Sequence, residues 1–184
     1  AVATEWARQD SEAAMNWVDN LSPEVQGEAY RRIVAEVVDE DPVQAIALVE
    51  SMPTGIDRRE MLETLASQWT YQDPQAAVAW LSSTNEGDRT TAMPKVIASW
   101  METDPMAASQ WVANLPESAS KDASILTMTQ SPALRRDPEA AMAWSSVIQN
   151  ANTRSQALHA AAERWMQTDP ANAEAWLNDD AGSK

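Results

Sequence analysis

Few side chains in this sequence have the types and spacing that catalysis requires. His159 is the only histidine and there is no cysteine, so the chain lacks the usual ligand set of a zinc site and any thiol nucleophile. The acidic clusters at residues 39–41 and 179–180 lack the alternating ligands and the glycine of a calcium loop. The four glycines form no phosphate-binding loop. We therefore expect a protein that is not an enzyme and that uses no metal or cofactor.

Three arginines recur at one place in a repeating pattern. Arg58, Arg89 and Arg154 each precede an Asp-Pro dipeptide by the same interval, and each precedes the intervening tryptophan by a shorter, equally constant one. On an acidic protein they could form a ladder that pairs with carboxylates of a partner. The alternative is an internal salt bridge to the next repeat, or support of a helix corner. We favour the internal role, because a residue that recurs in the repeats is needed by the repeat itself.

Tryptophans recur with the same regularity. Eight of the nine form pairs with one constant spacing, and an aspartate lies between the two members of each pair. The pairs are Trp6 and Trp17, Trp69 and Trp80, Trp100 and Trp111, and Trp165 and Trp176. Exposed indoles could stack on a carbohydrate, but their place on an apolar helical stripe favours burial in the core.

One further position lies beside that apolar stripe, four residues after each proline. It is occupied by Met15 (counted from Ser11), Ile46, Val78, Ser109, Met142 and Glu174. These residues widen the apolar face, and we favour packing against the next hairpin. Alternatively they line a groove for a partner, where methionine would suit an adaptable partner helix.

The elements that position these residues begin at regularly spaced aspartates, each followed by proline, or by serine in the first copy. They are Asp10, Asp41, Asp73, Asp104, Asp137 and Asp169. An aspartate accepts a hydrogen bond at a helix start, and proline suits the first helical turn, so each dipeptide predicts a short helix. A longer helix then returns to the next aspartate, as over residues 57–72, 88–103 and 153–168. At Pro94 and Pro132 we expect a late start or a kink.

Such hairpins predict an all-α fold. We expect an α-solenoid of about six stacked helical hairpins with a period of 31–33 residues, forming a single array over residues 1–184.

The stretch over residues 169–176, Asp-Pro-Ala-Asn-Ala-Glu-Ala-Trp, resembles the opening of a tetratricopeptide repeat. The interval between successive aspartates is also close to the repeat length of that family. The likeness covers nearly the whole chain, although no Leu-Gly follows the tryptophan and the first helix is shorter. The resemblance implies a right-handed superhelix whose inner face receives an extended segment or a helix of a partner.

Charge narrows the choice of partner. With 28 acidic and 13 basic residues the net charge is -15, which opposes binding to nucleic acid or to anionic membranes and favours a basic protein or peptide. No apolar run is long enough for membrane insertion. The chain begins at Ala1 without a methionine, which favours a removed signal peptide or a trimmed chain, and with it an extracytoplasmic bacterial location.

We therefore expect a non-catalytic protein–protein interaction scaffold. The alternatives are a structural protein that self-associates head to tail, and an acidic inhibitor that covers a basic protein surface.

Overall fold

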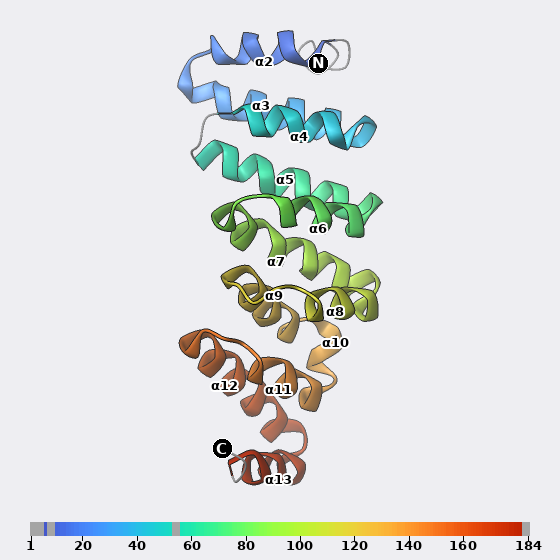
Figure 1. The fold of residues 1–184 in the computed structure, drawn as a ribbon, viewed down its shortest axis with the longest axis vertical. Helices are drawn as coiled ribbons and strands as arrows, with labels where there is room; N and C mark the ends of the chain where they lie inside the picture. The colour runs from blue at the N-terminus through green and yellow to red at the C-terminus, as the bar shows by residue number, and fades with distance from the viewer. Residues whose placement is uncertain (1–5, 7–9, 53–55, 182–184) are drawn as a thin grey trace. The chain divides into compact units, whose positions relative to one another are not determined.

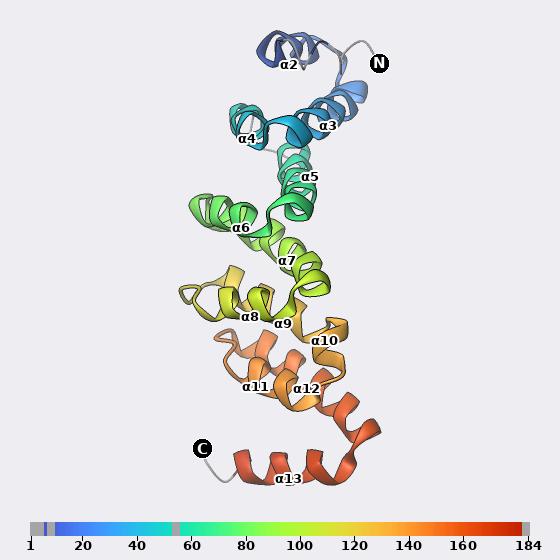
Figure 2. The ribbon, with the colours of Figure 1, turned by 90° about the vertical axis from the view of Figure 1, so that its right-hand side faces the viewer.

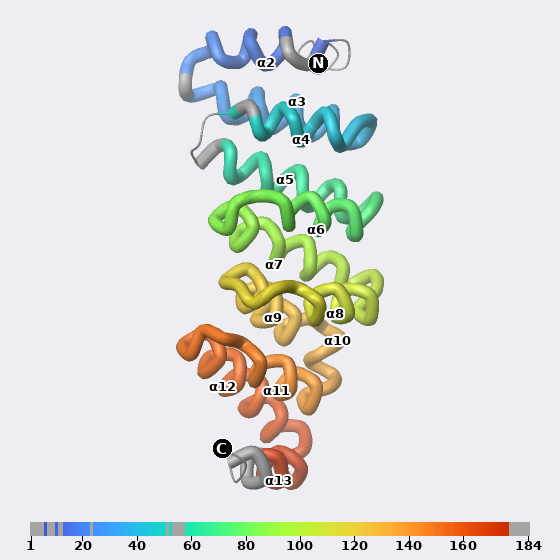
Figure 3. Tube along the Cα trace, viewed as in Figure 1, coloured from blue at the N-terminus to red at the C-terminus, as the bar shows by residue number. Residues whose placement is uncertain are grey.

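The computed structural model describes residues 6, 10–52 and 56–181, and in this part of the chain every regular element is a helix. The chain divides into two compact units, Ala1–Val96 and Ile97–Lys184, with one helix crossing the boundary. In the first unit the helices are α2 (Ser11–Asp19), α3 (Pro23–Glu40), α4 (Pro42–Ser51), α5 (Ile56–Gln72) and α6 (Pro74–Ser83) (Figures 1 and 3). The helix α7 (Glu86–Thr103) crosses into the second unit. There follow α8 (Pro105–Ala113), α9 (Ala119–Thr129), α10 (Pro132–Arg135), α11 (Pro138–Ser146), α12 (Ala151–Thr168) and α13 (Pro170–Ala181). The prediction of an all-α fold is confirmed for the described residues.

Aspartate starts a helix at every predicted position. At each one the carboxylate accepts a hydrogen bond from the backbone N–H three residues later, at 2.9–3.3 Å. The six caps are Asp10, Asp41, Asp73, Asp104, Asp137 and Asp169. A residue before proline is disfavoured in the α conformation, so the aspartate turns the chain out of one helix and starts the next. Between α5 and α6, for example, Asp73 alone forms the corner.

In unit 1 the helices pack both on their sequence neighbours and on the next helix but one. The helix α3 lies on α4 and on α5, and α2 contacts α4. Figure 2 shows α2, α4 and α6 along one side of this unit and α3 and α5 along the other. Ile33, Leu62 and Leu81, each at most 1% exposed, are among the side chains that fill its core.

In unit 2 the most extensive packing joins α11 and α12, and α9 lies against both of them. At Pro132, where we expected a late start or a kink, the helix is instead interrupted: α9 ends at Thr129 and the short helix α10 begins at this proline. At Pro94, where we expected a late start or a kink, the late start is wrong, because α7 already begins at Glu86 and continues through the proline. Ile125, Met128 and Ile148 are completely buried.

The tryptophan pairs lie across the corners. Ring centroids are 6.0 Å apart in Trp69–Trp80, and 6.4, 6.5 and 6.3 Å apart in the other three pairs. Three of these rings, Trp80, Trp100 and Trp165, are at most 9% exposed, which confirms the predicted core packing there. In the first pair Trp17 is 42% exposed.

None of the described helices is both long and apolar enough to cross a membrane.

Candidate functional site

The recurring arginines bond within the chain. Arg89 donates to the carbonyls of Ser82 at 2.9 Å and Thr84 at 3.2 Å, and it forms an ion pair with Glu86. Arg154 donates to the carbonyls of Ile148 and Gln149 at 2.7 and 3.3 Å. Both guanidinium groups therefore satisfy carbonyls at the end of the preceding short helix.

Arg58 makes a different internal bond. Its guanidinium pairs with Asp88, which belongs to α7, the long helix of the following hairpin. The two side chains are 14% and 15% exposed. These contacts support the internal role over a ladder that faces a partner.

Sequence reasoning missed two other members of this position, because their residue types differ. Gln26 precedes Pro42 by the same interval that separates the arginines from their prolines, and it donates to the carbonyls of Val18 and Asp19, both at 3.2 Å. Lys121 stands one position further from its proline. It donates to the carbonyl of Leu115 at 2.9 Å and pairs with Glu117 at 2.8 Å. The distance from the proline is a signal that could have found Gln26, whereas Lys121 departs from it by one position.

The position four residues after each proline is mostly covered. Met15, Val78 and Met142 are 7%, 0% and 1% exposed. Ile46 and Ser109 are half-buried, and Glu174 is exposed. This burial supports packing between helices, and it leaves the buried members of this position no surface for a partner.

The residues considered for catalysis do not assemble. His159 is 77% exposed, and it lies 3.2 Å from Glu163 on the same helix. Within residues 6, 10–52 and 56–181 no group of three or more histidine, aspartate or glutamate side chains could hold a metal ion.

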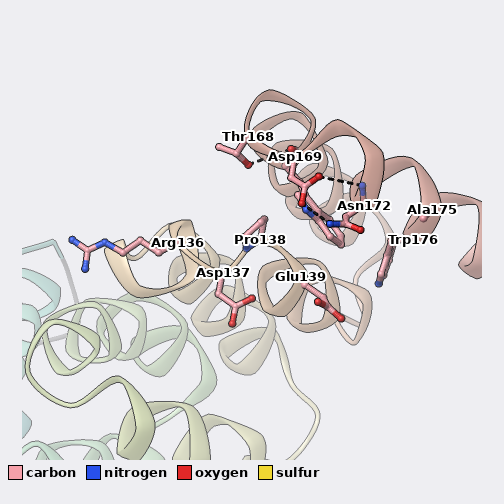
Figure 4. A pocket seen from close by; sticks show the side chains of 10 residues that line it. Arg136, Asp137, Pro138, Glu139, Thr168, Asp169, Asn172, Ala175 and Trp176 are labelled. Atoms are coloured by element: carbon pink, nitrogen blue, oxygen red, sulfur yellow. Dashed lines mark hydrogen bonds between the residues drawn. The ribbon is translucent and has the colours of Figure 1, made fainter.

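A concave site does form in unit 2, between two Asp-Pro corners. We call it the corner cleft, and it has a volume of about 560 Å³. One wall consists of residues 136–139, at the start of α11. The other wall, from the end of α12 and the start of α13, consists of Trp165, Thr168, Asp169, Asn172, Ala175 and Trp176. In Figure 4 Asp137 and Glu139 lie on one side of the cleft and Asp169, Asn172 and Trp176 on the other.

The carboxylates of the cleft differ in how they are bonded. Asp137 uses one oxygen to cap α11, at 3.0 Å from the amide of Ala140. Asp169 caps α13 and also accepts from the side-chain amide of Asn172 at 2.5 Å. Among the described residues Glu139 has no hydrogen-bond or ion-pair partner, and it is exposed. In the cleft, therefore, the Glu139 carboxylate makes no hydrogen bond to the described residues, and the Asp137 carboxylate uses only one of its two oxygens.

The aromatic part of the cleft is the Trp165–Trp176 pair. Trp165 is 5% exposed and anchors the pair in the core, whereas Trp176 is half-buried. Arg136 also belongs to the lining, but in Figure 4 its side chain points away from the other lining residues. Carboxylates beside an indole are a combination that attracts a cation.

A second cleft, of about 390 Å³, lies in unit 1 between α3, α5 and α7. Its charged residues neutralise each other, since Arg31 lies 3.7 Å from Glu60 and Lys95 pairs with Glu63. The side-chain amide oxygen of Gln68, which also lines it, is buried and has no hydrogen-bond partner among the described residues.

No protein-family model, no curated protein and no solved structure matches this chain.

Proposed function

We propose that this chain is a non-catalytic protein-interaction scaffold that binds a basic polypeptide. In this proposal residues 1–184 form an α-solenoid of about six stacked helical hairpins, similar to tetratricopeptide repeats. Three features support the architecture: the spacing of the corner aspartates, the capping bond at all six of them, and the packing of α3 on α5 and of α2 on α4 in unit 1. Stacked repeats of this kind bind through extended surfaces.

The observation that carries the function is the excess of acidic side chains, 28 against 13 basic ones. Arg58, Lys121 and Arg154 are bonded inside the chain, so they do not reach out for an acidic partner. Glu102 and Glu139 are exposed, and neither has a bonding partner in the described part of the chain. With a net charge of -15, this surface attracts basic segments and repels acidic ones.

The test is calorimetric titration with basic peptides of one composition in which the positions of the basic residues are permuted. A scaffold with a defined surface prefers one permutation by roughly tenfold or more, which corresponds to about 1.4 kcal/mol. Its affinity falls as salt rises, because screening shortens the reach of the exposed carboxylates. A matched peptide set with glutamate in place of the basic residues is the control.

Two results contradict the proposal. If no basic peptide binds at low salt, the scaffold function is wrong. If every permutation binds equally, the surface recognises net charge alone, and the acidic inhibitor of a basic protein becomes the better description.

A second candidate is self-association, which one observation favours. Trp6 and Trp17 pair at 6.4 Å but remain 38% and 42% exposed, whereas Trp80 at the equivalent place is 9% exposed. If a second copy covers this pair, association increases with salt, since screening relieves repulsion between copies that each carry a charge of -15. Sedimentation that finds only monomers at every salt and protein concentration rules this out.

A further inference from the structure

We infer that the corner cleft of unit 2 binds one arginine side chain of a partner segment. The inference rests on the proposed function and names the chemistry of its site. The guanidinium lies against the indole of Trp176 and donates hydrogen bonds to the carboxylates of Glu139 and Asp137.

The shape of the cleft suits a side chain that enters from solvent. Its walls come from two successive helix starts, at Pro138 and Pro170, and its volume is about 560 Å³. That volume is within the range of small-ligand pockets and exceeds what a single guanidinium needs, so the stem of the side chain fits as well.

The electrostatics of the cleft select a cation. Asp137, Glu139 and Asp169 contribute three carboxylates against the single guanidinium of Arg136, which points away from the other lining residues (Figure 4). The positive ends of the α11 and α13 dipoles are already compensated by their capping aspartates. The carboxylate of Glu139 is therefore free to engage a ligand.

The aromatic wall distinguishes arginine from lysine. A planar guanidinium stacks on an indole face and presents donors in several directions in one plane, whereas an ammonium is a compact and strongly hydrated point charge. Trp176 keeps part of its surface exposed while Trp165 holds the pair in the core. Because carboxylates lie on both walls of the cleft, they can accept hydrogen bonds from guanidinium N–H groups that point in different directions.

The residue at the place of Glu139 sets this corner apart from the other Asp-Pro corners. The second helical residue is Val43 in α4, Gln75 in α6, Met106 in α8 and Ala171 in α13. None of these four can accept a hydrogen bond as a carboxylate. Among the five Asp-Pro corners, the α11 corner alone adds an acidic side chain at this position to the capping aspartate; at the sixth corner, Asp10-Ser11, the same position is Glu12.

The probe that tests the inference is Nα-acetyl-arginine amide, with Nα-acetyl-citrulline amide as an uncharged analogue of nearly the same shape. Binding is followed by NMR through the indole N–H of Trp176, assigned by comparison with Trp176→Phe. We expect the arginine probe to shift this signal in a saturable way and the citrulline probe to leave it in place.

Two variants and a matched control locate the contacts. Glu139→Gln removes the charge and keeps the shape, so it weakens binding of the arginine probe by roughly fivefold to tenfold. Trp176→Leu removes the aromatic face and weakens binding by roughly fivefold, with Trp165 as the reporting indole. Glu163→Gln, on α12 outside the cleft lining, makes the same charge change and leaves the affinity unchanged.

The outcomes separate this inference from the proposed function. Equal shifts with citrulline, or an unchanged affinity in Glu139→Gln, overturn the arginine site even if the basic peptides bind elsewhere on the protein. Binding of the arginine probe without binding of any basic peptide supports the site and overturns the scaffold function.

Discussion

Asp122 offers a sharp test of how much the buried hydrogen bonds of unit 2 contribute to stability. Its side chain, 6% exposed on α9, holds the turn that precedes α12. One carboxylate oxygen accepts from the amide of Gln149 at 2.8 Å and the other from the amide of Asn150 at 2.7 Å. Replacing Asp122 by asparagine turns one of these acceptors into an NH₂ donor. That donor then faces a backbone N–H that has lost its partner.

The expected cost follows from the two bonds. A hydrogen bond to a charged group contributes about 1.5–3 kcal/mol, and the new donor–donor contact adds to its loss. We expect Asp122→Asn to lower the free energy of unfolding by about 3 kcal/mol. The matched control is Asp104→Asn, also in unit 2. There the side chain caps α8 through a single 3.0 Å bond. Asparagine caps a helix about as well as aspartate, so the control costs less than about 1 kcal/mol.

The assay is urea unfolding at neutral pH, followed by far-UV circular dichroism. With a slope of roughly 1–3 kcal/mol per molar urea, Asp122→Asn moves the midpoint down by about 1 M or more, and Asp104→Asn moves it far less. Equal midpoints for the two variants would refute the reasoning, because both remove one negative charge from the same unit.

Two further predictions concern buried aromatic residues. Trp100 is 3% exposed, so Trp100→Ala lowers the free energy of unfolding by about 3–5 kcal/mol in the urea assay, whereas Trp17→Ala, at a ring 42% exposed, costs less than half as much. Equal losses would contradict the core packing of the internal pairs. Burial and the hydrogen bond to Asp19 raise the pKa of the Tyr30 phenol above its usual range. The folded protein thus retains a proton that the unfolded chain loses above about pH 10, so stability falls as pH rises through that range, and it falls less steeply in Tyr30→Phe. Thermal melts from neutral to alkaline pH measure both slopes, with Tyr71→Phe, at an 80% exposed phenol, as the control; parallel slopes in the wild type and Tyr30→Phe would contradict the linkage.

The local structure of this chain could be predicted well because its signals act over short distances. A carboxylate at Asp73 reaches the amide of Ala76 whatever the rest of the molecule does, and Pro74 fits the first turn. Aspartate caps a helix at all six corners, and proline follows it at five of them, so the helix starts were correctly placed from residue spacing. Pro94 shows the limit of local rules, since the helix α7 continues through it. Whether the hairpins form one array over residues 1–184 stays a prediction.

The functional residues were predicted less well, because exposure is a tertiary property. Arg89 and Arg154 were recognised as recurring, yet the sequence left open whether they face a partner or the chain. Their bonds to carbonyls of the preceding turn depend on how each hairpin closes. Lys121 makes bonds of the same kind, although its residue type and its slightly longer spacing separate it from them in the sequence.

The sequence by itself determined the helical class, the six corners and the apolar stripe, because caps and periodicity act within a few residues along the chain. Only the tertiary structure decided which charged side chains form hydrogen bonds or ion pairs inside the chain and which remain exposed to solvent. Glu139 and Trp176 belong to different hairpins, and no local rule connects them. The packing of α11 and α13 against α12 brings the two side chains to one cleft and leaves the Glu139 carboxylate without a partner among the described residues.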